Sequence, residues 1–240
     1  LANAQEMVGF TILIGASLSF LGGYFLSGRS LIPIKKSVER QQEFLADASH
    51  ELRTPIAVIQ TNLEVVKAST DESVESQLTW INNAYDEIQW MQHIVEDLMF
   101  LARADSGDMM VQQEPVDLTY AIKVVCDKME PLAAKKGIAF INELEDELII
   151  SGDEKQITQL LVILLDNAIK YSSENTIIRV NGKQSPQGVS VEVIDQGIGI
   201  PKDEINKVTQ RFYRVDKARS RTEGGTGLGL SIANWIVDEH

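Results

Sequence analysis

The pattern of apolar residues changes twice along the chain and predicts three regions. Residues 8–26 form an uncharged, mostly apolar run, and residues 31–102 carry apolar side chains at heptad spacing. From residue 116 onward, short apolar runs alternate with stretches of helical periodicity. Heptads are typical of helical bundles, and alternating strands and helices are typical of α/β domains. The expected fold is therefore a transmembrane helix, an antiparallel helical hairpin and an α/β two-layer sandwich.

The run at residues 8–26 is long enough to cross a bilayer, which takes about 20 residues. Glu6 precedes it, and the basic residues that follow it are Arg29, Lys35, Lys36 and Arg40. The positive-inside rule then places its C-terminal side in the cytoplasm. A buried core helix is the alternative, but the glycine and serine content with this flanking charge favours a membrane span. We predict an extracytoplasmic remnant at 1–7, a span of the cell membrane at 8–26 and a short helical linker at 27–43, with Pro33 in the first turn of the cytoplasmic helix.

The heptad region predicts two helices that pair with a second copy of the chain. The first heptad row, a predicted buried seam, consists of Leu31, Val38, Leu45, Leu52, Ile59 and Val66. A polar turn at 68–73, with Asp71 or Ser73 as the cap, leads into a helix with two interleaved rows. These rows are Ile81, Ile88, Val95 and Ala102, and Ala84, Met91 and Leu98. One hairpin cannot bury every row, so we expect a homodimeric four-helix bundle over 44–106.

Composition narrows the function classes. The net charge of −13 argues against nucleic-acid binding, which normally needs a basic surface. Cys126 is the single cysteine, so it cannot form an intramolecular disulfide, and we expect it to be a small buried side chain in a reducing compartment. An anionic ligand remains compatible with this composition, because local charge determines such a site.

A histidine with candidate chemistry lies on the first of these helices, in the run F-L-A-D-A-S-H-E-L-R-T-P from Phe44 to Pro55. His50 and Thr54 are four residues apart and share a helix face, and His50 lies off the heptad seam. We therefore expect His50 to be exposed. The run resembles the H box of bacterial sensor histidine kinases. That resemblance implies that His50 accepts the γ-phosphoryl group of ATP, that Glu51 acts as its base, and that Thr54 positions water for dephosphorylation of a response regulator.

The remaining chain predicts an ATP-binding domain over 116–240, after a linker at 107–115 that contains Pro115. The expected helices are 118–136, a long helix from an Asp153 cap to Tyr171, and 231–238. The expected strands are 138–142, 148–150, 176–182 and 189–195. The resemblance implies two further strands after residue 240, so we expect this domain to be incomplete.

The long helix contains D-N-A-I-K-Y at 166–171, which resembles the N box of the family. Asn167 carries an amide oxygen suited to Mg²⁺, Lys170 can neutralise phosphate charge, and Tyr171 can pack along a nucleotide. Without the resemblance, we would interpret these residues as the solvent-exposed face of a helix. The family usually has a second asparagine four residues before the first, where this chain has Ile163, so that contact is missing or replaced, with Asp166 as one replacement.

Three further segments resemble the G1, F and G2 boxes. The segment D-Q-G-I-G at 195–199 follows a predicted strand and resembles the G1 box. A buried Asp195 at this place can accept a hydrogen bond from the adenine amino group. Gly197 and Gly199 let the backbone approach the ligand. R-F-Y-R at 211–214 resembles the F box, with Thr209 in place of its leading phenylalanine. The chain from 211 to 221 is rich in basic residues, which predicts a mobile lid over the triphosphate. These residues are Arg211, Arg214, Lys217, Arg219 and Arg221.

The G2-like segment runs from Gly224 to Leu230 and leads into the last helix. Its main-chain N–H groups and the helix N-terminus can bind phosphate. The residues assigned to nucleotide contacts here are Gly225, Thr226, Gly227, Leu228 and Gly229.

The resemblance implies a dimeric membrane histidine kinase that uses ATP and Mg²⁺ and passes phosphate to a response regulator receiver domain. Two alternatives stay open. One is a signalling scaffold or phosphatase that binds ATP without phosphorylating itself, given Ile163 and Thr209. The other is a different ATPase with the same nucleotide-binding fold; such proteins lack the H box, so His50 and Glu51 argue against it.

Overall fold

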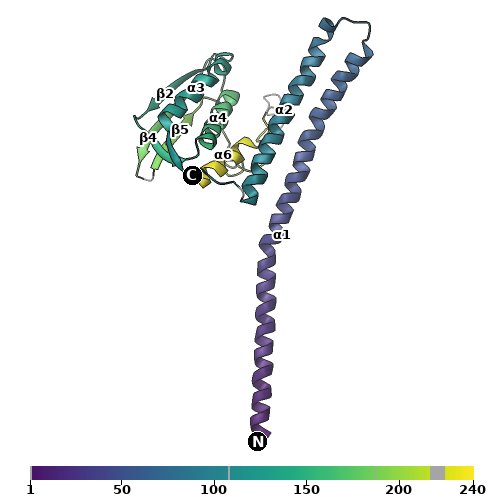
Figure 1. The fold of residues 1–240 in the computed structure, drawn as a ribbon, viewed down its shortest axis with the longest axis vertical. Helices are drawn as coiled ribbons and strands as arrows, with labels where there is room; N and C mark the ends of the chain where they lie inside the picture. Colours follow the sequence, from purple (N-terminus) through teal and green to yellow (C-terminus); the bar gives the residue numbers. More distant parts are fainter. Residues whose placement is uncertain (1, 108, 187, 217–224) are drawn as a thin grey trace. The chain divides into compact units, whose positions relative to one another are not determined.

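The computed structural model describes residues 2–107, 109–186, 188–216 and 225–240. Helix α1 (Ala2–Ala68) and helix α2 (Val74–Ser106) are joined by a short turn, and the C-terminal part of α1 runs antiparallel to α2 (Figure 1). Ser73 caps α2, because its hydroxyl accepts a hydrogen bond from the Ser76 amide at 3.3 Å. At the other end, Gly107 adopts a left-handed φ of 73°, which ends the helix. The predicted hairpin is confirmed.

Helix α1 continues without interruption through residues 27–43, so the predicted helical linker is part of one helix with the segment that contains His50. Pro33 lies inside this helix and not in its first turn, so that prediction was wrong. A proline inside a helix removes one main-chain hydrogen bond and crowds the preceding turn, yet α1 continues on both sides of Pro33. Within the described part of the chain, no helix combines the length and the apolar character needed to cross a membrane.

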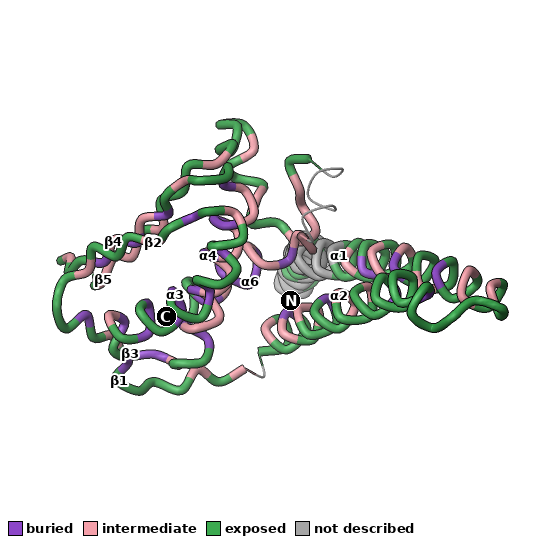
Figure 2. Tube along the Cα trace, turned by 90° about the horizontal axis from the view of Figure 1, so that it is seen from above, coloured by how far each residue is buried: buried purple, intermediate pink, exposed green. Residues whose placement is uncertain are grey.

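The two apolar rows of α2 have different environments in the single chain. Ala84 is buried, and Met91 and Leu98 are half-buried, so this row faces the interior of the hairpin. The other row is exposed, with 50% of Ile88 and 43% of Val95 accessible. Most of the hairpin surface is likewise exposed in Figure 2. An apolar row at seven-residue spacing that its own chain leaves uncovered is what a helical dimer requires.

The heptad row of α1 is less buried than the sequence suggested. Leu52, Ile59 and Val66 are half-buried, while Val38 and Leu45 are exposed. The prediction of a buried seam therefore fails for the single chain. Heptad spacing identifies an apolar face, but it does not say whether the same chain or another one covers that face.

The C-terminal part of the chain alternates strands and helices as expected. Its elements are β1 (Glu114–Asp117), α3 (Leu118–Ala134), β2 (Ala139–Leu144), β3 (Ile149–Gly152), α4 (Glu154–Tyr171), β4 (Ile177–Ser185), β5 (Gly188–Ile194) and α6 (Gly229–Glu239). Strand β1 was not predicted, because Pro115 indicated a linker. It pairs antiparallel with β3, a two-stranded arrangement in which a proline is tolerated.

Strands β2, β4 and β5 form a mixed sheet in that order, with β2 parallel to β4 and β4 antiparallel to β5. Helices α3 and α4 cover one face of this sheet (Figure 1), which gives the expected two layers. Their apolar faces meet the sheet in one core. The largest fully buried residues of that core are Ile122, Val125, Leu148, Leu165, Ile178 and Val180.

Asp153 marks the start of α4, and Cys126 lies on the buried face of α3. Asp153 caps α4, since its Oδ1 accepts hydrogen bonds from the amides of Lys155 and Gln156 at 2.9 and 3.2 Å. Cys126 on α3 is buried, and burial raises the pKa of its thiol, whose Sγ lies 3.5 Å from Asn142 Oδ1. The expectation of a small buried cysteine is confirmed.

Replacement of Leu165 by alanine should destabilise the α/β domain by about 2–5 kcal/mol, because it leaves a cavity under a fully buried side chain of α4. Urea unfolding followed by circular dichroism measures the change. The matched control is Val124→Ala on α3, whose side chain is 44% exposed, and it should change stability by less than about 0.5 kcal/mol. Equal effects of the two substitutions would contradict this core assignment.

Candidate functional site

Four of the sequence segments singled out above meet around the C-terminal half of α4. A Cβ atom added to Gly229, the first residue of α6, would lie 3.3 Å from Ile163 Cγ2. One added to Gly197, after β5, would collide with the main-chain carbonyl of Tyr171. The Phe212 amide donates a hydrogen bond to the Gly227 carbonyl at 2.9 Å. The structure thus brings the N-, G1-, F- and G2-like segments together.

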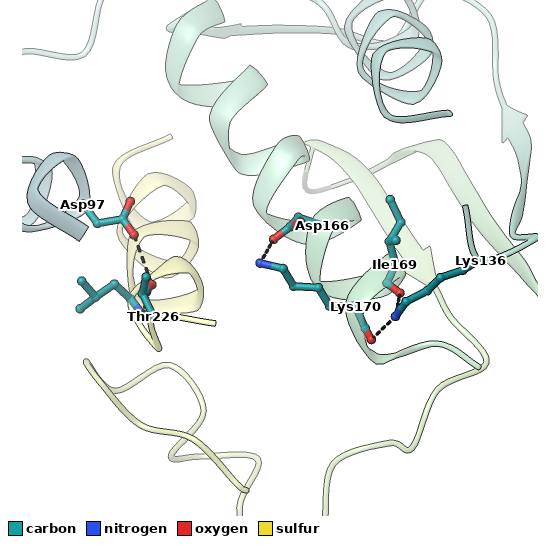
Figure 3. Close-up of polar contacts among 7 residues, drawn as sticks. Asp97, Lys136, Asp166, Ile169, Lys170 and Thr226 are labelled. Atoms are coloured by element: carbon teal, nitrogen blue, oxygen red, sulfur yellow. Dashed lines mark hydrogen bonds and ion pairs between the residues drawn. The ribbon is translucent and has the colours of Figure 1, made fainter. Parts of the chain in front are cut away.

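The polar residues of α4 lie on its partly exposed face. Lys170 Nζ and Asp166 Oδ2 form an ion pair at 2.6 Å, with about 30% of each side chain exposed (Figure 3). Asn167 and Tyr171 are half-buried. Among the described residues, none forms a hydrogen bond with the Asn167 amide group. The amide oxygen is thus available to a ligand, while Ile163 offers no polar atom.

The turn after β5 is held by its own aspartate. Asp195 Oδ1 accepts a hydrogen bond from the Gly197 amide at 2.8 Å, and Ser172 forms an antiparallel bridge with Gly197. Gly199 has a φ of +69°, a conformation that favours glycine. Asp195 is exposed rather than buried as expected, because it follows the end of β5, the outer strand of the sheet.

The glycine-rich segment before α6 packs on the F-like turn. Gly227 has a φ of +74°, and a Cβ there would approach the Phe212 main chain to 2.9 Å, so only glycine fits. Thr226 Oγ1 accepts a hydrogen bond from the Leu228 amide at 3.2 Å, and Leu228 is fully buried. No side chain among the described residues caps the N-terminus of α6. The predicted site residues Lys217, Arg219, Arg221 and Gly224 lie outside the described residues.

Two arginines of the F-like segment contact carboxylates of the hairpin. Arg211 forms two hydrogen bonds with Asp105 on α2, at 2.7 and 2.6 Å. Arg214 Nη2 lies 2.9 Å from Glu51 Oε2 on α1. Only 7% of the Arg214 side chain is exposed, and its Nε is buried without a hydrogen-bond partner among the described residues. That unsatisfied donor is suited to a further anionic group.

Asp97 on α2 is a residue that the sequence analysis missed. Thr226 Oγ1 donates a hydrogen bond to Asp97 Oδ2 at 3.3 Å (Figure 3), and Trp235 of α6 packs edge-on against Phe100 with ring centroids 5.3 Å apart. Burial raises the pKa of Asp97 to about 6, although the Thr226 hydrogen bond acts in the opposite direction. The signal in the sequence was weak: Asp97 is next to Leu98 of a heptad row, but its partner lies far away in the chain.

The three candidate residues of the H-like segment lie on α1 as the periodicity predicted. His50 is exposed, and Glu51 and Thr54 are half-buried. The exposed imidazole can take part in chemistry with a separate group, because the unprotonated ring nitrogen of a neutral histidine can act as a nucleophile.

Comparison with protein families identifies both parts of the chain. Residues 40–107 match the His Kinase A (phospho-acceptor) domain, and residues 152–240 match the histidine kinase-, DNA gyrase B- and HSP90-like ATPase domain. Each match contains the residues described above: His50 in the first, and the four segments around α4 in the second.

Relatives match across both domains. The chain is 35% identical over 86% of its length to the sensor histidine kinase WalK of Bacillus subtilis, of which it covers 34%. It is 36% identical over 92% of its length to the sensor protein CiaH of Streptococcus pneumoniae, of which it covers 49%. The chain therefore spans about a third to a half of these curated relatives.

A solved structure has the same fold. The histidine kinase ThkA, in complex with the response regulator protein TrrA, aligns with a TM-score of 0.63 and 22% identity over 78% of this chain and 56% of that one. With a phospho-acceptor hairpin, an ATPase domain of this type and such relatives along most of its length, the chain belongs to the sensor histidine kinases of two-component systems.

Proposed function

We propose that this chain transfers the γ-phosphoryl group of ATP to His50 and then passes it to an aspartate of a response regulator. The observation that supports this most directly is the meeting of four nucleotide-type segments around α4 in a chain that also displays an exposed histidine next to a carboxylate. A scaffold that only binds ATP needs no such histidine. A different ATPase of the same fold needs neither His50 nor Glu51.

The residues around α4 fit an adenine nucleotide. Asp195 would accept a hydrogen bond from the adenine amino group, and its exposure leaves it open to a ligand. The uncapped N-terminus of α6 would bind phosphate through its main-chain N–H groups and helix dipole. Gly199, Gly225, Gly227 and Gly229 would let the chain approach the ligand, and Tyr171 would pack along it.

Mg²⁺ also fits, with Asn167 as its protein ligand. An amide oxygen without a hydrogen-bond partner among the described residues is a suitable hard ligand, and Mg²⁺ usually takes few protein ligands because it keeps water and phosphate oxygens. When bound with ATP, it would neutralise phosphate charge. Lys170 would add a second positive charge beside it, since Asp166 already fixes the ammonium group on that face of α4.

Arg211 and Arg214 would stabilise the charge that develops during transfer. Both guanidinium groups now contact carboxylates, and carboxylates and phosphates bind arginine in the same fork-like geometry. Exchange of one anion for the other requires no new kind of contact. The buried Nε of Arg214 provides an additional donor for this exchange.

At His50, a ring nitrogen would attack the γ-phosphorus while the bond from that phosphorus to the β-γ bridging oxygen breaks and ADP leaves. The proton on the other ring nitrogen would move to Glu51, the adjacent carboxylate. Thr54, one helical turn further on, would position water for hydrolysis of the phosphorylated regulator. ThkA, which has this fold, was solved with a response regulator, which supports a regulator partner here.

We further propose that the chain works as a homodimer anchored in the cell membrane. The exposed row of Ile81, Ile88 and Val95 on α2 supports a dimer, because a second hairpin would cover it. The uncharged run at 8–26, followed by basic residues, supports an anchor whose C-terminal side is cytoplasmic.

We propose that the contacts between the hairpin and the ATPase domain hold the chain in a state in which transfer is off. Arg211, Arg214 and Thr226 are held by the carboxylates of Asp105, Glu51 and Asp97. ATP phosphates would compete for these same three residues. This state therefore becomes less favourable as nucleotide binds, and it depends on the ionisation of Asp97.

Incubation of the chain with γ-labelled ATP and Mg²⁺ should give protein-bound label that acid removes and base does not, as expected for phosphohistidine. His50→Gln should lose at least about 100-fold of the label, since it removes the nucleophile. His93→Gln is the matched control: His93 is also exposed, on α2, and its loss should leave labelling unchanged. Full labelling of His50→Gln would contradict the assignment, and ATP binding without any label would favour the scaffold.

Arginines placed within the apolar run should release the chain from membranes. Ile14→Arg with Leu18→Arg adds two charges at the centre of the proposed span, at a cost of about 2.5–3.5 kcal/mol each. The measurement is the fraction of chain retained in membranes after an alkaline wash. Gln41→Arg with Gln42→Arg adds the same charge outside the run and should not change that fraction, and release of both variants alike would contradict a span at 8–26.

The contact between the two domains should weaken as pH rises through about 6. The pKa of Asp97 is about 6 in this contact and 3.8 in its ordinary state, so the docked form binds the proton more tightly. Docking is therefore favoured below about pH 4 and loses that contribution as pH rises through 6. Trp235 fluorescence, in a chain with Trp80→Phe and Trp90→Phe, reports the contact with Phe100.

Asp97→Asn should remove this pH dependence and leave the contact in place at pH 7, because a neutral amide avoids the cost of burying a charge. His93, Glu96 and Lys170 also influence Asp97 electrostatically, so His93→Gln serves as the control and should keep the transition. Loss of the transition in the histidine variant, and not in Asp97→Asn, would assign the effect to His93.

A further inference from the structure

Lys136 lies on the loop between α3 and β2, outside every sequence segment assigned to the nucleotide. Its ammonium group donates hydrogen bonds to the main-chain carbonyls of Ile169 at 3.0 Å and Lys170 at 2.7 Å (Figure 3). The side chain is half-buried. A lysine that served only to keep the protein soluble would extend into solvent, whereas this one extends to the last turn of another helix.

The two carbonyls belong to the C-terminal turn of α4, which ends at Tyr171. The last four carbonyls of a helix have no partner within the helix, and the negative end of the helix dipole lies there. A single ammonium group satisfies two of those carbonyls and complements the dipole. Lys136 therefore acts as the C-terminal cap of α4, although it comes from a different element.

The backbone holds Lys136 in this position independently of its side chain. Its amide donates a hydrogen bond to the Ala133 carbonyl at 3.0 Å, and its carbonyl accepts one from the Asn175 amide at 2.8 Å. The adjacent Gly137 has a φ of +66°, and a Cβ there would collide with Asn175 Oδ1. Replacement of the side chain alone would thus remove the cap and leave the loop contacts in place.

The capped turn is connected to both ends of the proposed nucleotide site. Lys170 belongs to that turn and would face the phosphates. The Tyr171 carbonyl packs tightly against Gly197, and Ser172 bridges to the same glycine. Gly197 in turn donates the hydrogen bond that fixes Asp195, the proposed adenine contact, at 2.8 Å.

We propose that Lys136 is a positioning residue for the nucleotide. By capping α4, it holds Lys170 and Asp195 in the positions from which they would contact the phosphates and the adenine. This inference rests on the proposed function, because it names a residue that supports the same site. Lys136 itself does not touch the nucleotide. Its effect should therefore appear in nucleotide affinity and much less in the rate of transfer once the site is filled.

Lys136→Met keeps the length of the side chain and removes the ammonium group. The dissociation constant for ATP with Mg²⁺, measured by calorimetry on the 240-residue chain, should rise roughly tenfold, as expected for loss of charge-assisted hydrogen bonds. The KM for ATP should rise by a similar factor, while kcat at saturating ATP should change less than about twofold. Lys136→Arg should recover most of the affinity, since a guanidinium group can donate to both carbonyls.

Lys128→Met is the matched control, because Lys128 is an exposed lysine of α3 without a hydrogen bond or ion pair to any described residue. It should bind ATP as the unaltered chain does. A lower melting temperature of Lys136→Met with unchanged ATP affinity would overturn the inference and leave Lys136 a role in folding only. Lys136→Leu, which also lacks a donor, serves as a second variant if the Met variant folds poorly, and unaltered ATP affinity in Lys136→Leu would overturn the inference as well.

Failure of the proposed function gives a different result. If the unaltered chain does not bind ATP, both the proposed function and this inference are overturned. If the unaltered chain binds ATP and the two methionine variants bind it equally well, only the role of Lys136 is overturned.

Discussion

Burial of the apolar face of α4 is the constraint on which the ATPase domain depends. Ile157, Leu161 and Leu165 pack with α3 and the sheet, and this fixes the rotation of the helix about its axis. With the rotation fixed, Asn167 and Lys170 necessarily face the other way. The packing energy of the core thus determines where the polar groups of the site lie, and the loops around α4 need to supply only short-range contacts.

Much of the fold could be predicted because its signals are local. Heptad spacing, the Ser73 and Asp153 caps and the alternation after residue 116 identify helices and strands from neighbouring residues alone. Strand β1 was not predicted, because Pro115 disfavours a strand locally and the pairing with β3 that forms the strand involves residues far away in the sequence. The place of Pro33 was also mispredicted, because a proline favours the first turn of a helix, whereas α1 begins well before it.

The site could be predicted only in part, because motifs identify residue types and not their partners. The sequence pointed to Asn167, Lys170 and the glycines, but not to Asp97 or Lys136. Both of these act through contacts with residues more than thirty positions away, on elements whose approach no local pattern encodes. Asp195 was expected to be a buried carboxylate at the end of a strand, yet its position beyond an outer strand leaves it exposed.

The contact between Ile163 and Gly229 limits how this site can change during evolution. An alanine at 229 would place its Cβ 3.3 Å from Ile163 Cγ2, so the isoleucine would have to move by a few tenths of an ångström in a packed region. A smaller residue at 163 would make room for that alanine. The two positions, 66 residues apart in the numbering, should therefore vary together among descendants of this sequence, and each restricts the substitutions that the other can accept.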